Sequence, residues 1–397
     1  MYRLVYFLLL ISAPVFSQSK KDFVTYNKVT FDLYENEAWD QLIITGMEAL
    51  NNNYDFFYLR SRLGIAYYRK SNFAKSINHF EKALLFNDSD PVILEYLFFA
   101  YIFSNRYQEA SRLYYKHFQL FKVKDLSVKP KVFDKLYIQG GIKFSDHNTE
   151  LGTQVDNISY GYIGASINIR GRFNIFQYVG ILSQGFTDKY IYQGYLYNYH
   201  YYFRQFEYYV HGKLLLGKGW FISPAYHLIR VDVISDKYND HYYGLSINKN
   251  FNKIRLGINI SKAYILDTDV TQIVPEISYY PLGNTKLYFT LINTNNKSGN
   301  NDLKNQFSGK MGIKVFNKTW LEGLYAYGKV QFPSYDNGYV LYNNPDYLIS
   351  RGGLFFYHYF NNHSQITLGY VLENKEQITT EDQYTHHLVI AGLNIKF

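Results

Sequence analysis

The sequence contains no cysteine, only 8 prolines and 3 tryptophans in 397 residues, and no long apolar run. The absence of cysteine excludes a disulfide scaffold, a thiol nucleophile and a cysteine-ligated zinc site. Because no stretch reaches about 18 apolar residues, a membrane-spanning helix is excluded as well. Charged residues make up only 19% and aromatic residues 20%, which is incompatible with a disordered chain.

The N-terminus has the layout of a secretory signal peptide. Arg3 supplies positive charge, residues 4–11 form an apolar run, and Val15 and Ser17 are small enough for the −3 and −1 positions of a cleavage site. We therefore predict a signal peptide over residues 1–17. The alternative is a buried N-terminal helix or strand.

The next segment, residues 18–125, has an internal period of 34 residues. Trp39, Phe73 and Tyr107 are spaced at this interval, which is typical of paired antiparallel helices. The best unit reads Leu63-Gly64-x-x-Tyr67, then Phe73, then Phe80-x-x-Ala83, with Pro91 opening the next unit. This pattern resembles the tetratricopeptide repeat, in about three units that start near 23, 57 and 91. It departs from the family at Leu33, Phe98 and His117.

The resemblance implies that the first helix of each unit lines a concave groove. The corresponding positions are Tyr58, Ser61, Tyr68, Arg69, Glu95 and Phe99. The expected partner is a periplasmic protein or a glycan. The nearly balanced charge of this segment argues against a nucleic acid. The competing interpretation is that the aromatic members of the set are packing residues, since aromatic stripes at helical spacing usually belong to a core.

After Pro130 the hydrophobic period changes from 3.6 to 2. Residues 253–262 place isoleucine and leucine on one face and polar residues or glycine on the other, and the last strand alternates in the same way. A soluble sandwich with its apolar face inward and a membrane barrel with its apolar face outward both produce this pattern.

Loop spacing and aromatic placement favour the barrel. Short turns are expected near Gly171, Gly217, Phe251, Gly283, Asn317 and Asn361. Long polar segments are expected at 146–156, 186–203, 232–240, 263–271, 294–304, 331–347 and 374–384. Short periplasmic turns that alternate with long outer loops are typical of membrane barrels, and aromatic residues crowd the strand ends as an interfacial girdle requires.

The C-terminus resembles the outer-membrane barrel assembly signal of Gram-negative bacteria. The residues that carry the resemblance are Val389, Leu393, Ile395 and Phe397. It implies an outer-membrane location, contact with outer-membrane lipid, and recognition of the last strand by the barrel-assembly machinery.

We therefore predict an α+β multidomain chain. A helical repeat domain (18–125) and a linker (126–133) precede an antiparallel transmembrane β-barrel (134–397) of about 14 strands, within a range of 12–16. The uncertain stretch is Tyr190–Tyr202, which is either one long loop or two further strands. Pro224 and Pro275 are expected on the lipid-facing side, where they disturb the ladder because proline has no N–H.

Inward-facing charges give the first indication of what the barrel does. The lumenal candidates are Arg255, Glu276, Lys310, Lys314, Glu322 and Lys396. The basic excess of the strand region favours an anionic cargo, whereas the plainer interpretation is that polar side chains simply solvate the interior. The sequence has no H-E-x-x-H and no G-x-S-x-G motif, so we predict no catalytic residue, no metal site and no cofactor.

The segment 219–226, Gly-Trp-Phe-Ile-Ser-Pro-Ala-Tyr, follows a tyrosine-rich stretch and resembles the YaiO-like outer-membrane barrel family. The order of signal peptide, repeats and barrel is also similar to exopolysaccharide export porins. These resemblances imply a channel for export or uptake of a glycan or other anionic solute, with repeats that dock periplasmic partners. The alternatives are a non-conducting membrane-anchored scaffold and a barrel enzyme acting on lipid or glycan.

Overall fold

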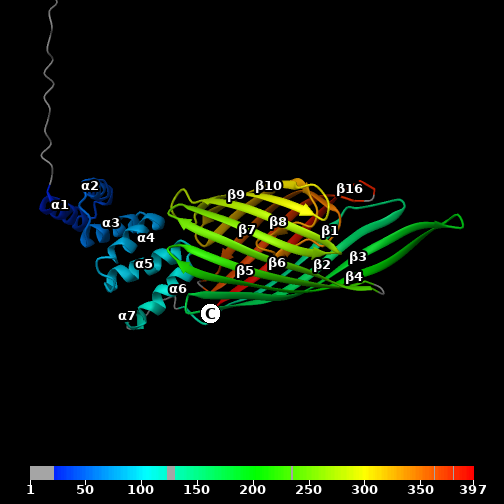
Figure 1. Ribbon diagram of the computed structural model, residues 1–397, viewed down its shortest axis with the longest axis horizontal. Helices are drawn as coiled ribbons and strands as arrows, with labels where there is room; N and C mark the ends of the chain where they lie inside the picture. Colours follow the sequence, from blue (N-terminus) through cyan, green and yellow to red (C-terminus); the bar gives the residue numbers. More distant parts are fainter. Residues whose placement is uncertain (1–21, 123–129, 234–235, 362, 379) are drawn as a thin grey trace, which may run out of the picture.

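The computed structural model describes residues 22–122, 130–233, 236–361, 363–378 and 380–397. The predicted signal peptide and the first half of the predicted linker lie outside these residues. Within the described part of the chain, no helix is both long and apolar enough to cross a membrane. Figure 1 shows a helical domain at one end of a barrel, with the C-terminus at that same end.

The helical domain consists of three hairpins and a short final helix. Its helices are α1 (Phe23–Glu35), α2 (Trp39–Asn51), α3 (Phe57–Arg69), α4 (Phe73–Ala83), α5 (Pro91–Phe103), α6 (Tyr107–Lys116) and α7 (Phe118–Lys122). The hairpins begin at Phe23, Phe57 and Pro91, so the sequence period is also the structural period. A Cβ on Gly64 would lie 2.4 Å from the Phe80 ring, which shows how closely α3 and α4 approach.

A histidine is buried between two helices of this domain. The side chain of His79 stacks on Tyr67, and its Nδ1 lies 3.2 Å from Nη1 of Arg60, which in turn is paired with Asp55 at 2.6 Å. Because a guanidinium only donates, Nδ1 must accept and the ring is neutral. Burial, and then the positive charge of Arg60, lower the pKa of His79 from 6.5 to about 3.

Fourteen antiparallel strands close into a barrel, as predicted. They are β1 (Phe133–Ser145), β2 (Gly152–Ile169), β3 (Phe173–Tyr192), β4 (Tyr195–Gly217), β5 (Trp220–Val233), β6 (Asp236–Phe251), β7 (Ile254–Ile265), β8 (Thr268–Tyr279), β9 (Leu287–Ser298), β10 (Lys304–Phe316), β11 (Thr319–Val330), β14 (Tyr347–Tyr359), β15 (Ser364–Glu376) and β16 (Gln383–Lys396). The first and last strands pair from Lys135↔Lys396 to Ser145↔His386, and this pairing completes the ring.

Several predicted outer loops are wrong, because the strands continue through them. The stretch Tyr190–Tyr202 is neither a loop nor two new strands. It extends β3 and β4 into a hairpin that turns at Gln193-Gly194 and projects beyond the barrel (Figure 1). The predicted loop 263–271 is likewise a tight turn at Leu266-Asp267. Alternating tyrosine and polar residues sustain strand pairing outside the lipid. The loop prediction assumed that the strands end where the apolar residues end.

The segment 331–346 also departs from its predicted place in a long outer loop. It folds into the barrel and carries a small hairpin of β12 (Ser334–Tyr335) and β13 (Val340–Leu341). The outward placement predicted for Pro224 and Pro275 is found: both are exposed, and the β4–β5 and β8–β9 pairings skip the two prolines.

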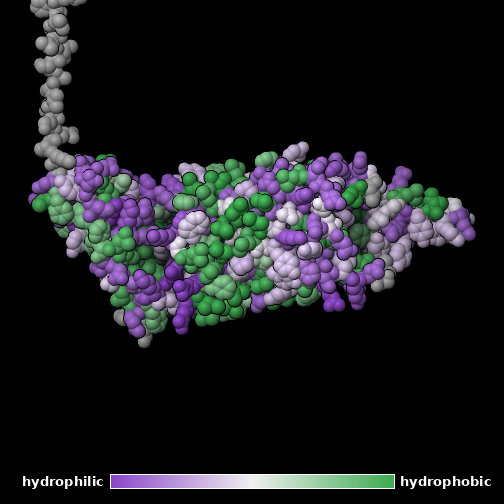
Figure 2. All heavy atoms as spheres, in the orientation of Figure 1, coloured by the Kyte–Doolittle hydropathy of each residue, from purple (hydrophilic) through white to green (hydrophobic). Residues whose placement is uncertain are grey.

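The face that carries the apolar side chains changes along the barrel axis. On β7, Ile254 to Ile260 alternate outward, as predicted, and Figure 2 shows a hydrophobic band over the strands near the helical domain. Beyond it the pattern inverts: Ile265 and Val270 are buried inside, whereas Lys262 is exposed outside. An apolar belt followed by a polar exterior matches a barrel that crosses lipid and then continues into water.

The belt predicts effects of different size for two substitutions on β10. Met311 points outward and is 46% exposed, whereas Ser308 lines the interior. Met311→Lys should lower the free energy of unfolding by about 2 kcal/mol, because a lysine facing lipid is desolvated. Ser308→Lys should change it by less than half as much. Guanidinium unfolding in detergent micelles measures both, and equal losses would contradict the assigned faces.

The buried histidine predicts a pH dependence for the helical domain. Between pH 6.5 and about 3, the unfolded chain binds a proton at His79 that the folded chain excludes. Stability should therefore be constant above pH 6.5 and fall by about 2 kcal/mol by pH 5. Thermal melts followed by circular dichroism at 222 nm test this, and His79→Gln should flatten the dependence. An unchanged pH profile in that variant would refute the assignment.

Candidate functional site: a barrel lumen covered at both ends

The segment 331–346 crosses the lumen and touches strands around the whole barrel wall. Ser334 N donates to Gln272 of β8 at 3.1 Å, Asn337 Nδ2 donates to the Ser223 carbonyl of β5 at 3.0 Å, and Asn343 Nδ2 donates to Gln205 of β4 at 2.8 Å. Gln331 Nε2 donates to the Pro345 carbonyl and so joins the two ends of the segment to each other. The hydroxyl of Tyr384 on β16 donates to Asp346 at 2.6 Å and holds the far end to the wall. The lumenal segment is therefore docked by polar contacts in several directions.

Aromatic side chains add a second layer around this segment. The phenolic oxygens of Tyr178 and Tyr209 donate to the backbone carbonyls of Tyr339 and Asn337 at 3.0 and 3.2 Å. His227 Nδ1 donates to the Gly338 carbonyl at 2.8 Å, and its Nε2 lies 3.2 Å from Glu207. A carboxylate therefore orients the imidazole that holds the backbone of the lumenal segment.

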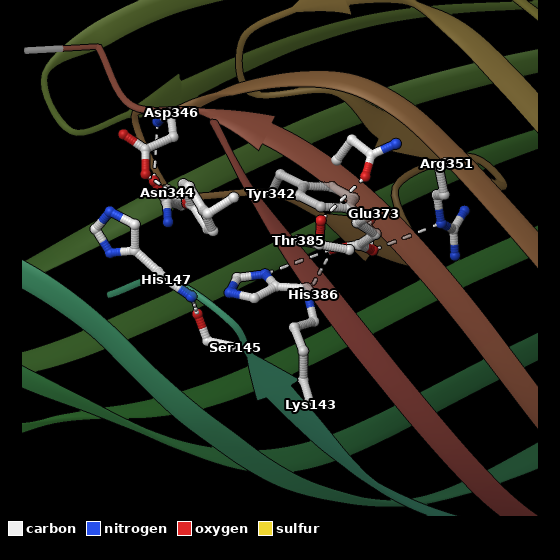
Figure 3. Close-up of polar contacts among 12 residues, drawn as sticks. Lys143, Ser145, His147, Tyr342, Asn344, Asp346, Arg351, Glu373, Thr385 and His386 are labelled. Carbon is white, nitrogen blue, oxygen red and sulfur yellow. Dashed lines mark hydrogen bonds and ion pairs between the residues drawn. The ribbon is translucent and has the colours of Figure 1, made fainter. Parts of the chain in front are cut away.

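A buried charged cluster lies beside the end of the segment (Figure 3). Glu373 of β15 is at its centre, with Lys143 Nζ at 2.9 Å, Arg351 Nε at 3.7 Å and His386 Nδ1 at 4.0 Å. The hydroxyl of Tyr342 donates to Glu373 and so joins the cluster to the lumenal segment. Removing one partner from a buried ionic cluster leaves an unpaired buried charge, so displacement of any one of these side chains would be costly.

Below the lumenal segment, toward the helical domain, lies a chamber of about 760 Å³. Four of the predicted lumenal residues, Arg255, Glu276, Lys310 and Glu322, line it. They do not form a ring of free positive charge. Arg255 pairs with Glu276 at 2.6 Å, and Lys310 pairs with Asp336 of the lumenal segment at 2.9 Å.

The other two predicted lumenal charges lie at the short-turn end. Lys314 Nζ lies 4.8 Å from the centre of the Trp320 ring, and Lys396 Nζ lies 4.5 Å from that of Tyr107 in α6. The chamber also contains cations that the sequence analysis did not select, including Lys213, which lies over Phe221 at 4.1 Å. Strand alternation marks such positions as inward, but it does not reveal which of them are paired.

The helical domain covers the short-turn mouth of the barrel. Gln108 Nε2 donates to the carbonyls of Arg172 and Lys213 at 3.0 and 2.8 Å, so one side chain links the β2–β3 turn to strand β4. Asn168 Nδ2 donates to Ser111 Oγ at 3.1 Å, and Ala74 N at the start of α4 donates to the Gly283 carbonyl at 3.0 Å. At α4, an N–H group without a partner in its own helix therefore meets a turn carbonyl, whereas α6 contacts the barrel through the side chains of Gln108 and Ser111.

Two glycines permit this contact. A Cβ on Gly171 would lie 2.0 Å from the backbone nitrogen of Arg112, and one on Gly283 would lie 2.1 Å from Oδ1 of Asn72. Both residues also have a positive φ, near +67° and +69°. The sequence analysis identified these positions as turns but gave no sign that a second domain packs on them.

The predicted groove residues have different environments. Ser61 is buried and its hydroxyl donates to the Phe57 carbonyl, while Tyr68 and Phe99 pack against the helical core. Glu95 is partly buried. Only Tyr58 and Arg69 of the six are exposed to solvent. The packing interpretation therefore describes Tyr68 and Phe99 better than the groove interpretation does.

The four residues of the C-terminal signal lie on β16 or just after it. Val389, Leu393 and Phe397 are 50%, 36% and 40% exposed on the outer face, and Ile395 lies on that face at intermediate exposure. Phe397 N donates to the Asp134 carbonyl at 3.0 Å, and its ring centre lies 4.8 Å from that of Phe133. In the described part of the chain, no group of three or more histidines and carboxylates would hold a metal ion.

No family model and no curated protein matches the chain. Similar solved structures include a TodX deletion mutant described as a monoaromatic hydrocarbon channel, at 9% identity, TM-score 0.47, and coverage of 67% of this chain and 91% of that one. A bacterial polysaccharide outer-membrane secretin matches at 9% identity, TM-score 0.40, and 68% and 100% coverage. The translocator domain of the autotransporter NalP from Neisseria meningitidis matches at 11% identity, TM-score 0.36, and 75% and 100% coverage. Such values assign no family, so function must be argued from this chain's own residues.

The mouth contact predicts a specific consequence of removing Gln108, which is only 6% exposed. Gln108→Ala deletes two hydrogen bonds and should weaken the docking of the helical domain by about 1–3 kcal/mol. Hydrogen exchange should then rise at residues 72–76 and 168–172. Gln119→Ala, at an exposed position of α7, is the matched control. Equal protection in all three proteins would show that Gln108 does not hold the mouth shut.

Proposed function

We propose that this protein is an outer-membrane channel in its closed state, with the helical domain as a gate at the periplasmic mouth. The observation that carries the proposal is the chamber of about 760 Å³ between two covers that are held by polar contacts. A small cavity of about 80 Å³ under α4 and α6 shares Lys213, Phe221 and Arg255 with the chamber, so the space continues to the gate.

The wall of the chamber supports transport of a polar solute. Two ion pairs lie in the closed chamber, Arg255–Glu276 and Lys310–Asp336, and the second joins the wall to the lumenal segment. Displacement of that segment would remove the carboxylate and leave the lysine free. The lumen would therefore be more basic in the open state, which favours an anionic solute such as an acidic glycan.

Orientation follows from the two ends of the barrel. Short turns in membrane barrels face the periplasm, and the helical domain sits on the short turns. Helices α4 and α6 rest on the barrel, whereas Tyr58 and Arg69 of α3 remain exposed. This surface is the proposed docking face for a periplasmic protein or glycan that opens the gate, and the outward residues of β16 are the proposed contact for the barrel-assembly machinery.

A scaffold with a permanently blocked lumen is the second candidate. The buried cluster around Glu373 favours it, because breaking the contact from Tyr342 would expose a carboxylate packed among cations. In this case the lumenal segment is a structural plug, and the barrel only anchors the helical domain.

Conductance in planar bilayers separates the two candidates. The full chain should conduct weakly, Gln108→Ala/Ser111→Ala should open briefly, and replacement of residues 333–343 by a glycine-serine segment should conduct more. Both changes together should give the largest current, with anion preference. Gln119→Ala should behave like the parent. No current above bare lipid in any form, each shown to be folded by heat-modifiable mobility, would overturn the channel and leave the scaffold.

A further inference from the structure

A hollow of about 830 Å³ lies on the outer surface of strands β2 to β6, at the upper edge of the apolar belt. Strand register places two rows of outward side chains across it: Ser159, Ser183, Arg204, Asp232 and Lys237 in one row, and Gly161, Ile181, Phe206 and Arg230 in the other. The barrel wall separates this hollow from the lumenal chamber, so it is a different site.

Side-chain size accounts for the hollow. Ser159, Gly161 and Ser183 are small and lie next to the much longer Arg204 and Phe206. A Cβ on Gly161 would have no neighbour closer than 3.9 Å, so the space above it is open. The volume falls in the range of about 300–1,000 Å³ that is usual for pockets binding small molecules.

The hollow is apolar on one side and positively charged on the other. Ile181 is 69% exposed, and Phe206 is also exposed beside it. Lys237 pairs with Asp232 at 3.1 Å, whereas in the described part of the chain neither Arg204 nor Arg230 forms an ion pair. The net charge of the hollow is therefore positive, and its two free guanidinium groups point outward.

The level at which the apolar side chains turn from the outer face to the interior indicates how high these cations lie relative to the membrane. Arg230 lies between Ile229 and Val231, whose side chains are fully buried inside the barrel. At this level the exterior of β5 is already polar, whereas Ile181 and Phe206, in the same row on β3 and β4, keep the outer surface apolar. The guanidinium groups thus lie where lipid headgroups begin.

We propose that this hollow on the outer surface of β2 to β6 binds a phosphorylated glycolipid of the outer leaflet. Acyl chains would lie on Ile181 and Phe206, and phosphate groups would contact Arg204 and Arg230. Guanidinium groups bind phosphate with paired hydrogen bonds, which suits this edge of the hollow. A free anion would account for the arginines but would leave the apolar floor unexplained. The proposal rests on the membrane orientation inferred above and not on conductance.

Native mass spectrometry of the full chain in detergent tests the proposal, with bis-phosphorylated lipid A as the probe. Arg204→Ala/Arg230→Ala should weaken binding at least tenfold. The matched control, Lys262→Ala/Lys297→Ala, removes the same charge from outward positions on β7 and β9 and should bind like the parent. The conductance of both variants should be unchanged, which keeps this test separate from that of the channel.

Gly161→Trp provides a second test that leaves every charge in place. It fills the hollow and should also reduce lipid A binding at least tenfold, in protein shown to be folded by heat-modifiable mobility. Inorganic phosphate and phosphatidylglycerol should compete weakly or not at all. Equal binding of lipid A by the parent and both hollow variants, equal loss in the control, or equal affinity for phosphatidylglycerol would overturn the assignment.

Discussion

The pairing of β1 with β16 is the interaction on which the rest of the structure depends. In hydrocarbon an unpaired backbone N–H or C=O costs several kcal/mol, so a sheet that crosses lipid must have no free edge. Closure fixes which face of every strand meets lipid and which meets the lumen. The belt, the chamber and the outer hollow all follow from this division of side chains between two environments.

A closed ring of fourteen strands creates a second requirement, because its interior has to be occupied by side chains, water or another part of the chain. Here the segment 331–346 occupies the outer half, and Tyr342, Asn337 and Ser334 join it to strands far apart in sequence. The lumenal segment thus fills part of the interior and lies across any path through the barrel. The cluster at Glu373 sets how strongly it is held.

The two covers differ in their chemistry. The helical domain meets the turns through single hydrogen bonds and two glycines that allow backbone contact, such as Gly171 under Arg112. The lumenal segment is held by buried ions and tyrosines. A contact of the first kind separates at low cost in water, whereas one of the second kind needs replacement partners. In the proposed channel, the helical domain is therefore the cover that moves.

Much of this architecture follows from the sequence alone. The 34-residue period locates the helical hairpins, and strict alternation in segments such as 253–262 locates the strands and their apolar faces, because periodicity is a local property. Loop spacing and aromatic strand ends then favoured a barrel of about 14 strands over a sandwich. The structure of the stretch Tyr190–Tyr202 was predicted wrongly, because strand alternation continues there beyond the lipid. The tertiary structure alone decided that 331–346 folds inward, that Lys310 is paired, that Tyr68 is core and that Gly171 carries a domain contact. These features join residues far apart in the chain, and no local pattern records which distant surfaces will meet.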